Sequence, residues 1–535
     1  MKRKAFFPLL FFIAAAVLCL KPENIRADDK TLTVSAGSEI MQIEPVIQEC
    51  ARKIGCKVGM VYQGSVDMML DLQKTDFAYD AVMPANSLWI RLGDKKLRRV
   101  SEEASVMRTP VVLGVKKSLA RKLGWIGKEV SVSDILNAVR NRQLRFSMTS
   151  ATQSNSGASA YMGLLFGLAG EPDMITSEHL GRDELQKNIK EIFSGMDRSS
   201  GSSGWLKDMF VTKYDTSEAM FNYESMVIAA NRQLAQNNKE ALYAVYPSDG
   251  LAIADSTLAF VSNGKNAAKK ELFIRFRDCL LSPEMQDKIF RQGFRTGLIG
   301  MNPENADQSL FNPDWGIDAA RVISPIPWPD PEVTEEALRL YQTFFRKPSY
   351  TAYLLDISGS MRGSGLAQLK QAMTGLLDQK TAGQYLLNAS ADDVHLVIAF
   401  DDSIANVWKV SGNNPDELSK LVGNINNLQV RGGTDIYLPI ARAMTLFQQE
   451  GEKMRGYLPA IILMTDGKSG GDLEEVKSHW KKLDAQFELP PIFGVTFGEA
   501  DTRQLEAVAR FSAGRVFDGQ KEGLVKAFRE VKGYN

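Results

Sequence analysis

The sequence predicts an α/β protein with two separate domains. Short apolar runs alternate with helical patterns of about 10–15 residues from residue 31 onward, which is typical of a largely parallel sheet. A proline-rich segment over residues 323–331 interrupts this alternation, and a new alternation begins at residue 350. A chain of 535 residues is also too long for one hydrophobic core. Each domain is therefore expected to contain its own sheet or sheets.

The composition is that of an ordinary globular protein, with 44% apolar and 24% charged residues. Lys and Arg together number 64, as do Asp and Glu. This balance gives no reason to expect binding to nucleic acid or to an anionic membrane.

The N-terminus predicts a secretory signal peptide. Lys2-Arg3-Lys4 forms a basic start, and Ala5 to Leu20 form an apolar stretch that only Pro8 interrupts. Cleavage is expected after Ala27, with an uncleaved anchor as the alternative. We expect a periplasmic or extracellular product, with no membrane span in the mature chain.

Export permits disulfides, and three cysteines lie beyond the predicted cleavage point: Cys50, Cys56 and Cys279. A local Cys50–Cys56 bridge would leave Cys279 as a free thiol. Three buried thiols are equally compatible with the sequence.

The first domain is expected to begin with a strand, a helix and a strand, and to continue in the same way. The predicted strands are 31–36, 57–62, 79–83, 111–115, 146–148, 225–230 and 256–262. The predicted helices are 40–54, 66–74, 133–140, a helix that ends at 168, and 283–291. The polar segment 199–204 is expected to be a flexible loop.

Three predicted helices begin at Gly/Ser turns: Gly37-Ser38, Gly64-Ser65 and Ser154-Asn155-Ser156. The unpaired N–H groups at a helix start attract anions and polar ligands. A single turn of this kind can be only a helix cap. Three in one domain indicate a ligand site.

The first domain resembles the bacterial extracytoplasmic solute-binding proteins with two α/β lobes. The resemblance covers about residues 30–320 and rests on the helix start 154–157, strand 79–83, crossover strand 109–114 and the segment 281–295. It implies a cleft between the lobes that closes on a small solute. The candidate cleft residues are Ser38, Ser65, Ser87, Ser154, Asn155, Ser156, Tyr223 and Glu224. If Glu224 lined the cleft, it would disfavour an oxyanion unless protonated or paired; otherwise it is a surface or structural charge.

The boundary between the domains is expected at the proline-rich segment, which has four prolines in nine residues. A helical pattern follows over residues 332–345 and should pack on one of the domains. The predicted organisation is a signal peptide (1–27), a bilobal domain (28–322), a linker with its helix (323–348) and a final domain (349–535).

The final domain is expected to be a doubly wound, Rossmann-like sheet. Its predicted strands are 350–355, 394–400, 460–464, 492–497 and 515–517. The predicted helices are 366–378, 415–425, 436–449, 473–483, 502–511 and 522–532.

Three loops of this domain carry oxygen-bearing side chains where predicted strands end or helices begin. Asp356, Ser358 and Ser360 alternate on the first loop, Thr434 precedes a helix and Asp466 follows a strand. In a doubly wound sheet these loops meet at the carboxyl edge, where ligands bind. Carboxylate and hydroxyl oxygens suit a hard cation such as Mg²⁺.

Together these residues resemble the metal-ion-dependent adhesion site of the von Willebrand factor type A domain, over about residues 349–535. The resemblance implies Ser358, Ser360 and Thr434 as direct ligands, with Asp356 and Asp466 holding metal-bound water or the ion. The implied metal is Mg²⁺, with Mn²⁺ or Ca²⁺ as alternatives. It also implies an open position for an acidic residue of a partner protein.

The sequence favours a binding protein over an enzyme, since no phosphate-loop, nucleophile-elbow or zinc-protease spacing occurs. The first hypothesis is an exported protein that captures a small solute and engages a partner protein through Mg²⁺. The alternative is an adhesion or envelope-scaffold protein whose first domain binds no small ligand.

Overall fold

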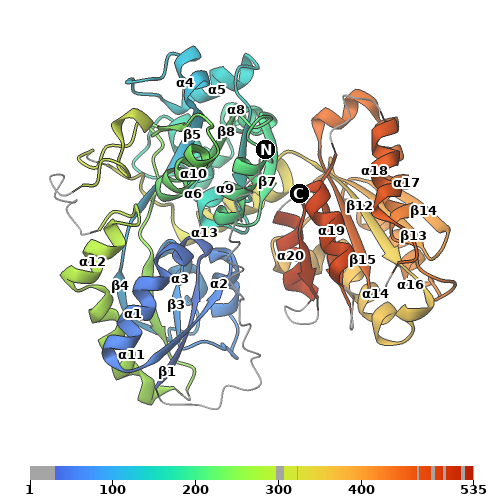
Figure 1. Ribbon diagram of the computed structural model, residues 1–535, viewed down its shortest axis with the longest axis horizontal. Coiled ribbons are helices and arrows are strands. Elements are labelled where there is room, and N and C mark those ends of the chain that lie inside the picture. Colours follow the sequence, from blue (N-terminus) through green and yellow to red (C-terminus); the bar gives the residue numbers. More distant parts are fainter. Residues whose placement is uncertain are drawn as a thin grey trace, which may run out of the picture.

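The computed structural model describes residues 30–264, 266–296, 306–321, 323–466, 469–483, 489–497, 502–519 and 524–533. The predicted signal peptide lies outside this part of the chain. The described chain forms a larger body with two sheets and a smaller body with one (Figure 1). Within the described residues, no helix is both long and apolar enough to cross a membrane.

The first lobe contains a five-stranded sheet in the order β2-β1-β3-β11-β4. Its strands are β1 (Thr31–Ala36), β2 (Lys57–Tyr62), β3 (Ala81–Met83), β4 (Val100–Ser105) and β11 (Thr257–Val261). Its helices are η2 (Ser38–Ile43), α1 (Glu44–Ile54), α2 (Ser65–Leu72), α3 (Leu88–Gly93), η3 (Ala267–Lys269), α11 (Lys270–Leu280) and α12 (Pro283–Phe290). Strand β1 pairs in parallel with β2 and β3, so helices η2 and α2 both begin at one edge of this sheet.

The second lobe contains a six-stranded sheet in the order β10-β5-β8-β6-β7, with β9 paired to β5. Its strands are β5 (Thr109–Lys116), β6 (Phe146–Thr149), β7 (Met196–Ser200), β8 (Ala219–Tyr223), β9 (Leu242–Val245) and β10 (Ile253–Ala254). Its helices are α4 (Lys117–Lys122), α5 (Val132–Arg140), α6 (Asn155–Leu168), α7 (Ser177–Leu180), α8 (Asp183–Ser194), α9 (Ser203–Thr212), α10 (Glu224–Gln236) and the short η5 (Pro313–Trp315). The chain passes from the first lobe to the second between β4 and β5, and returns to the first lobe between β10 and β11.

Two predictions for this lobe are wrong. The apolar run 225–230 lies in helix α10, and the strand is the preceding segment β8. A short apolar run does not distinguish a buried strand from a buried helix. The segment 199–204, predicted to be a flexible loop, instead contains the end of β7 and the start of α9. Ser200 and Ser203 are buried within the lobe.

The disulfide joins Cys50 to Cys279, and Cys56 is the free thiol. The predicted alternatives, a local Cys50–Cys56 bridge or three thiols, are therefore both wrong. Cys50 lies on α1 and Cys279 on α11, which pack against each other in the first lobe. Sequence spacing did not indicate this pair because 229 residues separate the two cysteines.

Replacement of Cys50 and Cys279 by Ser should lower the free energy of unfolding by about 2–5 kcal/mol, because the bridge closes a long loop in the unfolded chain. Denaturant unfolding under non-reducing conditions measures this. Cys56→Ser is the matched control and should leave the unfolding midpoint nearly unchanged. An equal loss in both variants would contradict a stabilising role of the bridge.

The linker helix packs on the second lobe. It runs as α13 (Pro331–Leu340) and continues as one π turn (Tyr341–Phe345). Ala337, Tyr341 and Phe345 are buried in the core of the second lobe. The Tyr341 ring lies 5.3 Å from the Tyr161 ring of α6.

The second domain is a six-stranded sheet in the order β14-β13-β12-β15-β16-β17. Its strands are β12 (Ser349–Asp356), β13 (Val394–Phe400), β14 (Ile404–Ser411), β15 (Leu458–Thr465), β16 (Ile492–Thr496) and β17 (Val516–Asp518). Its helices are η7 (Gly359–Met361), α14 (Ser364–Leu377), α15 (Gln379–Gln384), α16 (Pro415–Asn426), α17 (Tyr437–Gln449), η8 (Gly451–Gly456), α18 (Leu473–Lys482), α19 (Thr502–Ser512) and α20 (Leu524–Gly533). All strand pairs are parallel except β13 with β14, an antiparallel edge strand that the sequence interpretation missed.

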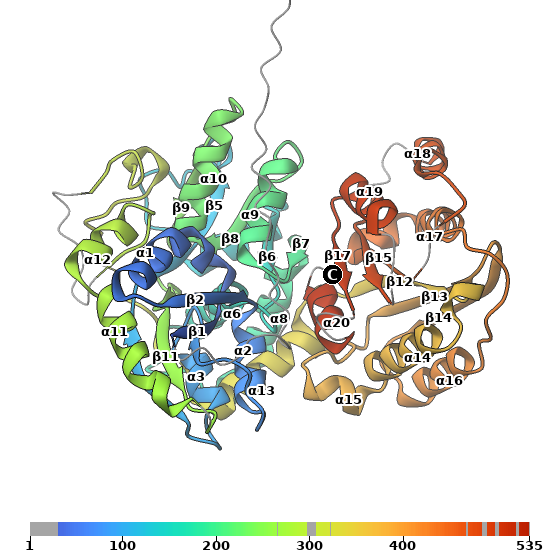
Figure 2. The same cartoon turned by 60° about the horizontal axis from the view of Figure 1, so that its bottom comes forward.

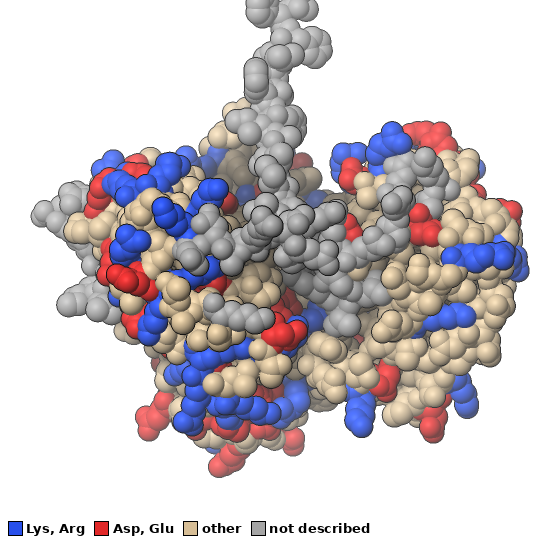
Figure 3. All heavy atoms as spheres, turned by 90° about the horizontal axis from the view of Figure 1, so that it is seen from below, with Lys and Arg blue, Asp and Glu red and all other residues tan. Residues whose placement is uncertain are grey.

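Both faces of this sheet are covered, as the doubly wound prediction requires (Figure 2). Tyr353 and Leu355 belong to a core with α14, α16 and α20, whereas Ala352 and Leu354 face α17, α18 and α19. Strands buried on both faces read as continuous apolar runs. Charges of both signs are interspersed over the face of the molecule in Figure 3.

Candidate metal and solute sites

The three predicted metal-site loops meet at the carboxyl edge of the second domain's sheet. Asp356 ends β12, Asp466 follows β15, and these two strands pair in parallel. The loop that carries Thr434 is joined to the first loop, because Gly359 N–H donates to the Gly432 carbonyl at 3.1 Å. The loops are thus positioned by adjacent strands and by one another.

Hydrogen bonds link the side chains of three of these positions. Ser358 Oγ lies 3.0 Å from Ser360 Oγ, and Ser360 Oγ donates to Asp466 Oδ1 at 2.9 Å. Asp356 and Ser358 are fully buried, whereas Ser360 is exposed. The cluster is therefore anchored inside the domain and opens to solvent at Ser360.

Asp356 orients the first loop from below. Its Oδ1 accepts the Ser358 N–H at 2.8 Å, and its Oδ2 accepts the hydroxyl of Thr465. Burial raises the pKa of the Asp356 carboxyl, although the hydrogen bonds from Thr465 and Ser358 lower it in part. A nearby divalent cation would favour the charged form of this carboxylate.

The oxygen spacing fits a small octahedral cation. Oxygens bound at about 2.1 Å to Mg²⁺ lie about 3.0 Å apart along the edges of the octahedron. The two separations in the Ser358–Ser360–Asp466 row, 3.0 and 2.9 Å, are compatible with this length, and they are also normal for hydrogen bonds between oxygens. Within the described residues, no group of three or more His, Cys, Asp or Glu side chains is arranged to hold a metal, at this edge or elsewhere. The predicted ligands at this edge are three hydroxyls and two carboxylates.

Asp401, which sequence reading did not single out, supports the loop of Thr434. Its carbonyl accepts the Asp435 N–H at 2.9 Å, and its carboxylate pairs with Arg431. Asp435 in turn accepts the N–H of Tyr437 at 2.9 Å and caps α17. Asp401 directly follows β13, so its position at the end of a predicted strand could have identified it in the sequence.

A cavity of about 100 Å³ lies between the two lobes of the first domain. The turns at Gly37, Gly64 and Ser154 all contribute to it, so the three helix starts converge as the sequence interpretation expected. The residues that line it are Gly37, Ser38, Glu39, Met41, Tyr62, Gln63, Gly64, Ser65, Asp67, Gln153, Ser154, Asn155, Gly201, Ser202, Tyr223 and Arg515.

The lobes touch each other across this cavity. Ser38 of the first lobe accepts from Ser202 of the second at 3.0 Å, and Trp89 Nε1 donates to Asn155 Oδ1 at 2.7 Å. The Val66 N–H also donates to the Gln153 carbonyl. These contacts define a closed cleft.

Glu39 is the buried acid of the cleft, and the sequence interpretation missed it. Only 3% of the residue is exposed, and its Oε1 has no hydrogen-bond partner. Burial raises the pKa of Glu39 to about 7. A carboxyl group with this pKa can donate a hydrogen bond when protonated or accept one when ionised.

The predicted cleft residues divide into two groups. Five line the cavity: Ser38, Ser65, Ser154, Asn155 and Tyr223. Ser156 lies behind them, 2.8 Å from Thr149 Oγ1. Ser87 instead donates to Asp255, and Glu224 forms a buried ion pair with Arg295.

Glu224 therefore has the structural role that sequence reading kept as its alternative. Arg295 binds its carboxylate with two hydrogen bonds, at 2.9 and 2.8 Å, and Tyr246 donates a third. The acid at position 224 is fully buried at the start of α10 and is not among the lining residues of the cleft.

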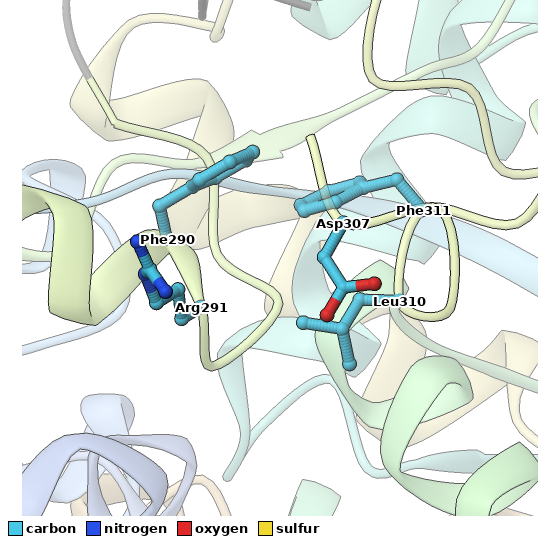
Figure 4. Close-up of a pocket in the computed structure, with 5 residues that line it drawn as sticks. All are labelled: Phe290, Arg291, Asp307, Leu310 and Phe311. Carbon is cyan, nitrogen blue, oxygen red and sulfur yellow. The ribbon is translucent and has the colours of Figure 1, made fainter. Parts of the chain in front are cut away.

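A second pocket, of about 320 Å³, lies beside α12 (Figure 4). The rings of Phe290 and Phe311 stack there with centroids 4.9 Å apart. Arg291, Asp307 and Leu310 complete its lining, and no predicted site residue contributes.

Two families match the chain. Residues 32–295 match the bacterial extracellular solute-binding protein family, and residues 352–530 match the von Willebrand factor type A domain. The chain therefore joins a domain of the solute-binding protein family to a von Willebrand factor type A domain. Both are families of binding domains. No curated protein matches the chain.

Solved structures similar to the first domain come from several bacteria. They include iron-bound HitA from Pseudomonas aeruginosa (14% identity, TM-score 0.41, 58% of this chain and 98% of that one). A solute-binding protein of an ABC transporter from Thermotoga lettingae, bound with α-D-tagatose, has 13% identity and a TM-score of 0.43 over 58% of this chain and 92% of that one. AfuA from Actinobacillus pleuropneumoniae, bound with fructose-6-phosphate, has 13% identity and a TM-score of 0.38 over 56% and 89%.

Proposed function

We propose that this protein is an exported binding protein with two sites. The cleft of the first domain captures a small solute, and the carboxyl edge of the second domain holds Mg²⁺ and engages a partner protein. The observation that carries the proposal is the joint occurrence of a polar cleft and a row of hydroxyl and carboxylate oxygens in one chain. A periplasmic or extracellular location accompanies this function.

In the metal site, Ser358, Ser360 and Thr434 would supply neutral hydroxyl oxygens, with Asp356 and Asp466 close by. The bound cation would supply an electrophilic centre for one further oxygen. Because Ser360 is exposed, an acidic side chain of a partner protein can approach this edge from solvent. Asp356 and Thr465 keep the loop in position, as their hydrogen bond is buried.

In the cleft, the size and the lining restrict the solute. A cavity of about 100 Å³ has room for only a few water-sized groups, because one water occupies about 30 Å³. Its hydroxyls and helix starts favour a polar solute that can accept hydrogen bonds. Glu39 favours a solute that also donates a hydrogen bond, because its buried Oε1 has no hydrogen-bond partner.

A thermal-shift screen of amino acids, sugars, oxyanions and metal complexes tests solute capture. A solute at about 100 times its Kd should stabilise the chain by about 2.7 kcal/mol. Ser154→Ala should weaken this shift, because Ser154 lines the cavity. Ser118→Ala is the control, since Ser118 pairs with Glu240 on the surface.

The adhesion or envelope-scaffold function remains the second candidate. It predicts that no compound in the screen raises the melting temperature beyond the effect of Mg²⁺ alone. If a solute raises the melting temperature of Ser154→Ala as much as that of the parent, the solute binds outside this cleft.

A further inference from the structure

The second domain lies against the mouth of the solute cleft. Arg515 comes from this domain, directly before β17, and is one of the cavity's lining residues. Figures 1 and 2 both show α20 on the side of the second domain that faces the first domain. The wall of the cleft is therefore built by both domains.

Arg529 of α20 binds both lobes at the same time. Its Nε donates to Asp67 Oδ1 of the first lobe at 2.5 Å, and its Nη2 donates to the Thr152 carbonyl of the second lobe at 3.1 Å. Only 3% of the Arg529 side chain and 11% of the Asp67 side chain are exposed. An opening movement of the lobes would separate these partners and leave buried charges unpaired, which is unfavourable.

The end of α20 adds contacts at the same place. The Gly533 carbonyl accepts the hydroxyl of Ser199 at 2.8 Å, and this bond is buried. There is no room for a larger residue at this position, because a Cβ on Gly533 would lie 1.8 Å from Gln153 Oε1 and 2.8 Å from Gly201 Cα. Gln153 and Gly201 both line the cavity.

We propose that the second domain latches the solute cleft closed, with Arg529 joining the lobes and Arg515 completing the wall, so that solute exchange requires α20 to leave this position. The proposal extends the proposed solute capture and concerns access to the cleft. The experiment measures access to the cleft in the absence of solute. Its result therefore does not depend on whether any solute binds.

Labelling of a cleft cysteine by a small methanethiosulfonate reagent measures access in the full mature chain. Ser202→Cys places the reporter in the cavity wall. The native free thiol Cys56 serves as the internal reference, because it lies in the first lobe and does not line the cavity. Peptide mass spectrometry follows both thiols in the same sample.

Two changes open the latch in different ways. Asp67→Asn removes the charge that Arg529 binds, and Gly533→Leu inserts a side chain where none fits. Each should raise the labelling rate of Cys at position 202 at least about tenfold, equivalent to 1.4 kcal/mol in the opening equilibrium. Asp392→Asn is the matched control, since Asp392 forms an exposed ion pair with Lys190 across the same two domains.

The proposal is overturned if both variants label at the parent rate, whether that rate is slow or fast. Unchanged labelling of Cys56 shows that the fold is intact. If Cys56 also accelerates, Gly533→Ala decides, because it adds only one methyl group. Faster labelling at position 202 alone then supports the latch, and an unchanged rate overturns it.

Discussion

Replacement of Asp356 and Ser358 by Ala should abolish Mg²⁺ binding and, with it, capture of the partner protein. Ser358 is expected to contact the cation, and Asp356 holds the Ser358 N–H in place at 2.8 Å. Loss of even an orienting group typically costs about 10–100-fold in metal affinity, so the double change should exceed about 100-fold. Calorimetric titration with Mg²⁺ measures this directly.

A second pair of substitutions separates loss of the metal from loss of the fold. Ser360→Ala with Asp466→Asn removes two oxygens at the open side of the site, where neither residue is fully buried. It should abolish Mg²⁺ binding with little change in melting temperature. Asp435→Asn removes a carboxylate at the same edge that caps α17, and should change the Mg²⁺ affinity by less than about threefold. Equal affinity in all these variants would contradict the predicted site.

Asp393→Ala should destabilise the chain by about 3–5 kcal/mol, because it leaves Arg346 as an unpaired buried charge. Both side chains are almost completely buried, and Asp393 Oδ1 also accepts the Ser349 N–H at 2.7 Å. Burial by itself would raise the pKa of Asp393. Arg346 and Lys532 outweigh that effect and hold the pKa well below its usual range. The pair thus fastens the end of the linker to the segment directly before β13.

The pKa shift also predicts a pH dependence. The folded-state pKa of Asp393 is below its unfolded value of 3.8, so its contribution is complete well above pH 4 and is lost as the pH falls further. Asp392→Ala is the matched control, because the neighbouring carboxylate is exposed and should cost less than about 0.5 kcal/mol. Denaturant unfolding at pH 7 and pH 3 tests both statements. Equal stability of the two variants at pH 7 would contradict them.

The family and fold predictions are confirmed, and physical reasons explain which details were missed. The strands of the second domain, such as β12, are buried on both faces and therefore stand out as apolar runs. Strand β14 lies at the sheet edge and contains only partly buried and exposed residues. Its sequence therefore has no continuous apolar run that would have predicted a strand. The run 225–230 was assigned to a strand because a short apolar run is ambiguous.

The metal-site residues lie at the ends of predicted strands or, for Thr434, just before a predicted helix, so sequence patterns could place them at one edge. The cleft is different, because its wall combines segments that are far apart. Glu39 adjoins a predicted turn and was within reach of sequence reasoning. Arg515 and Arg529 were not, since only the packing of the two domains brings them to Asp67 and the cavity.

Native mass spectrometry of the full mature chain, with and without Mg²⁺, tests the two-site account most directly. The account predicts one bound Mg²⁺ per chain that is lost in Ser360→Ala with Asp466→Asn. It also predicts an added small-molecule mass that this change leaves in place and Ser154→Ala diminishes. A chain that carries neither added mass under any condition would contradict the account.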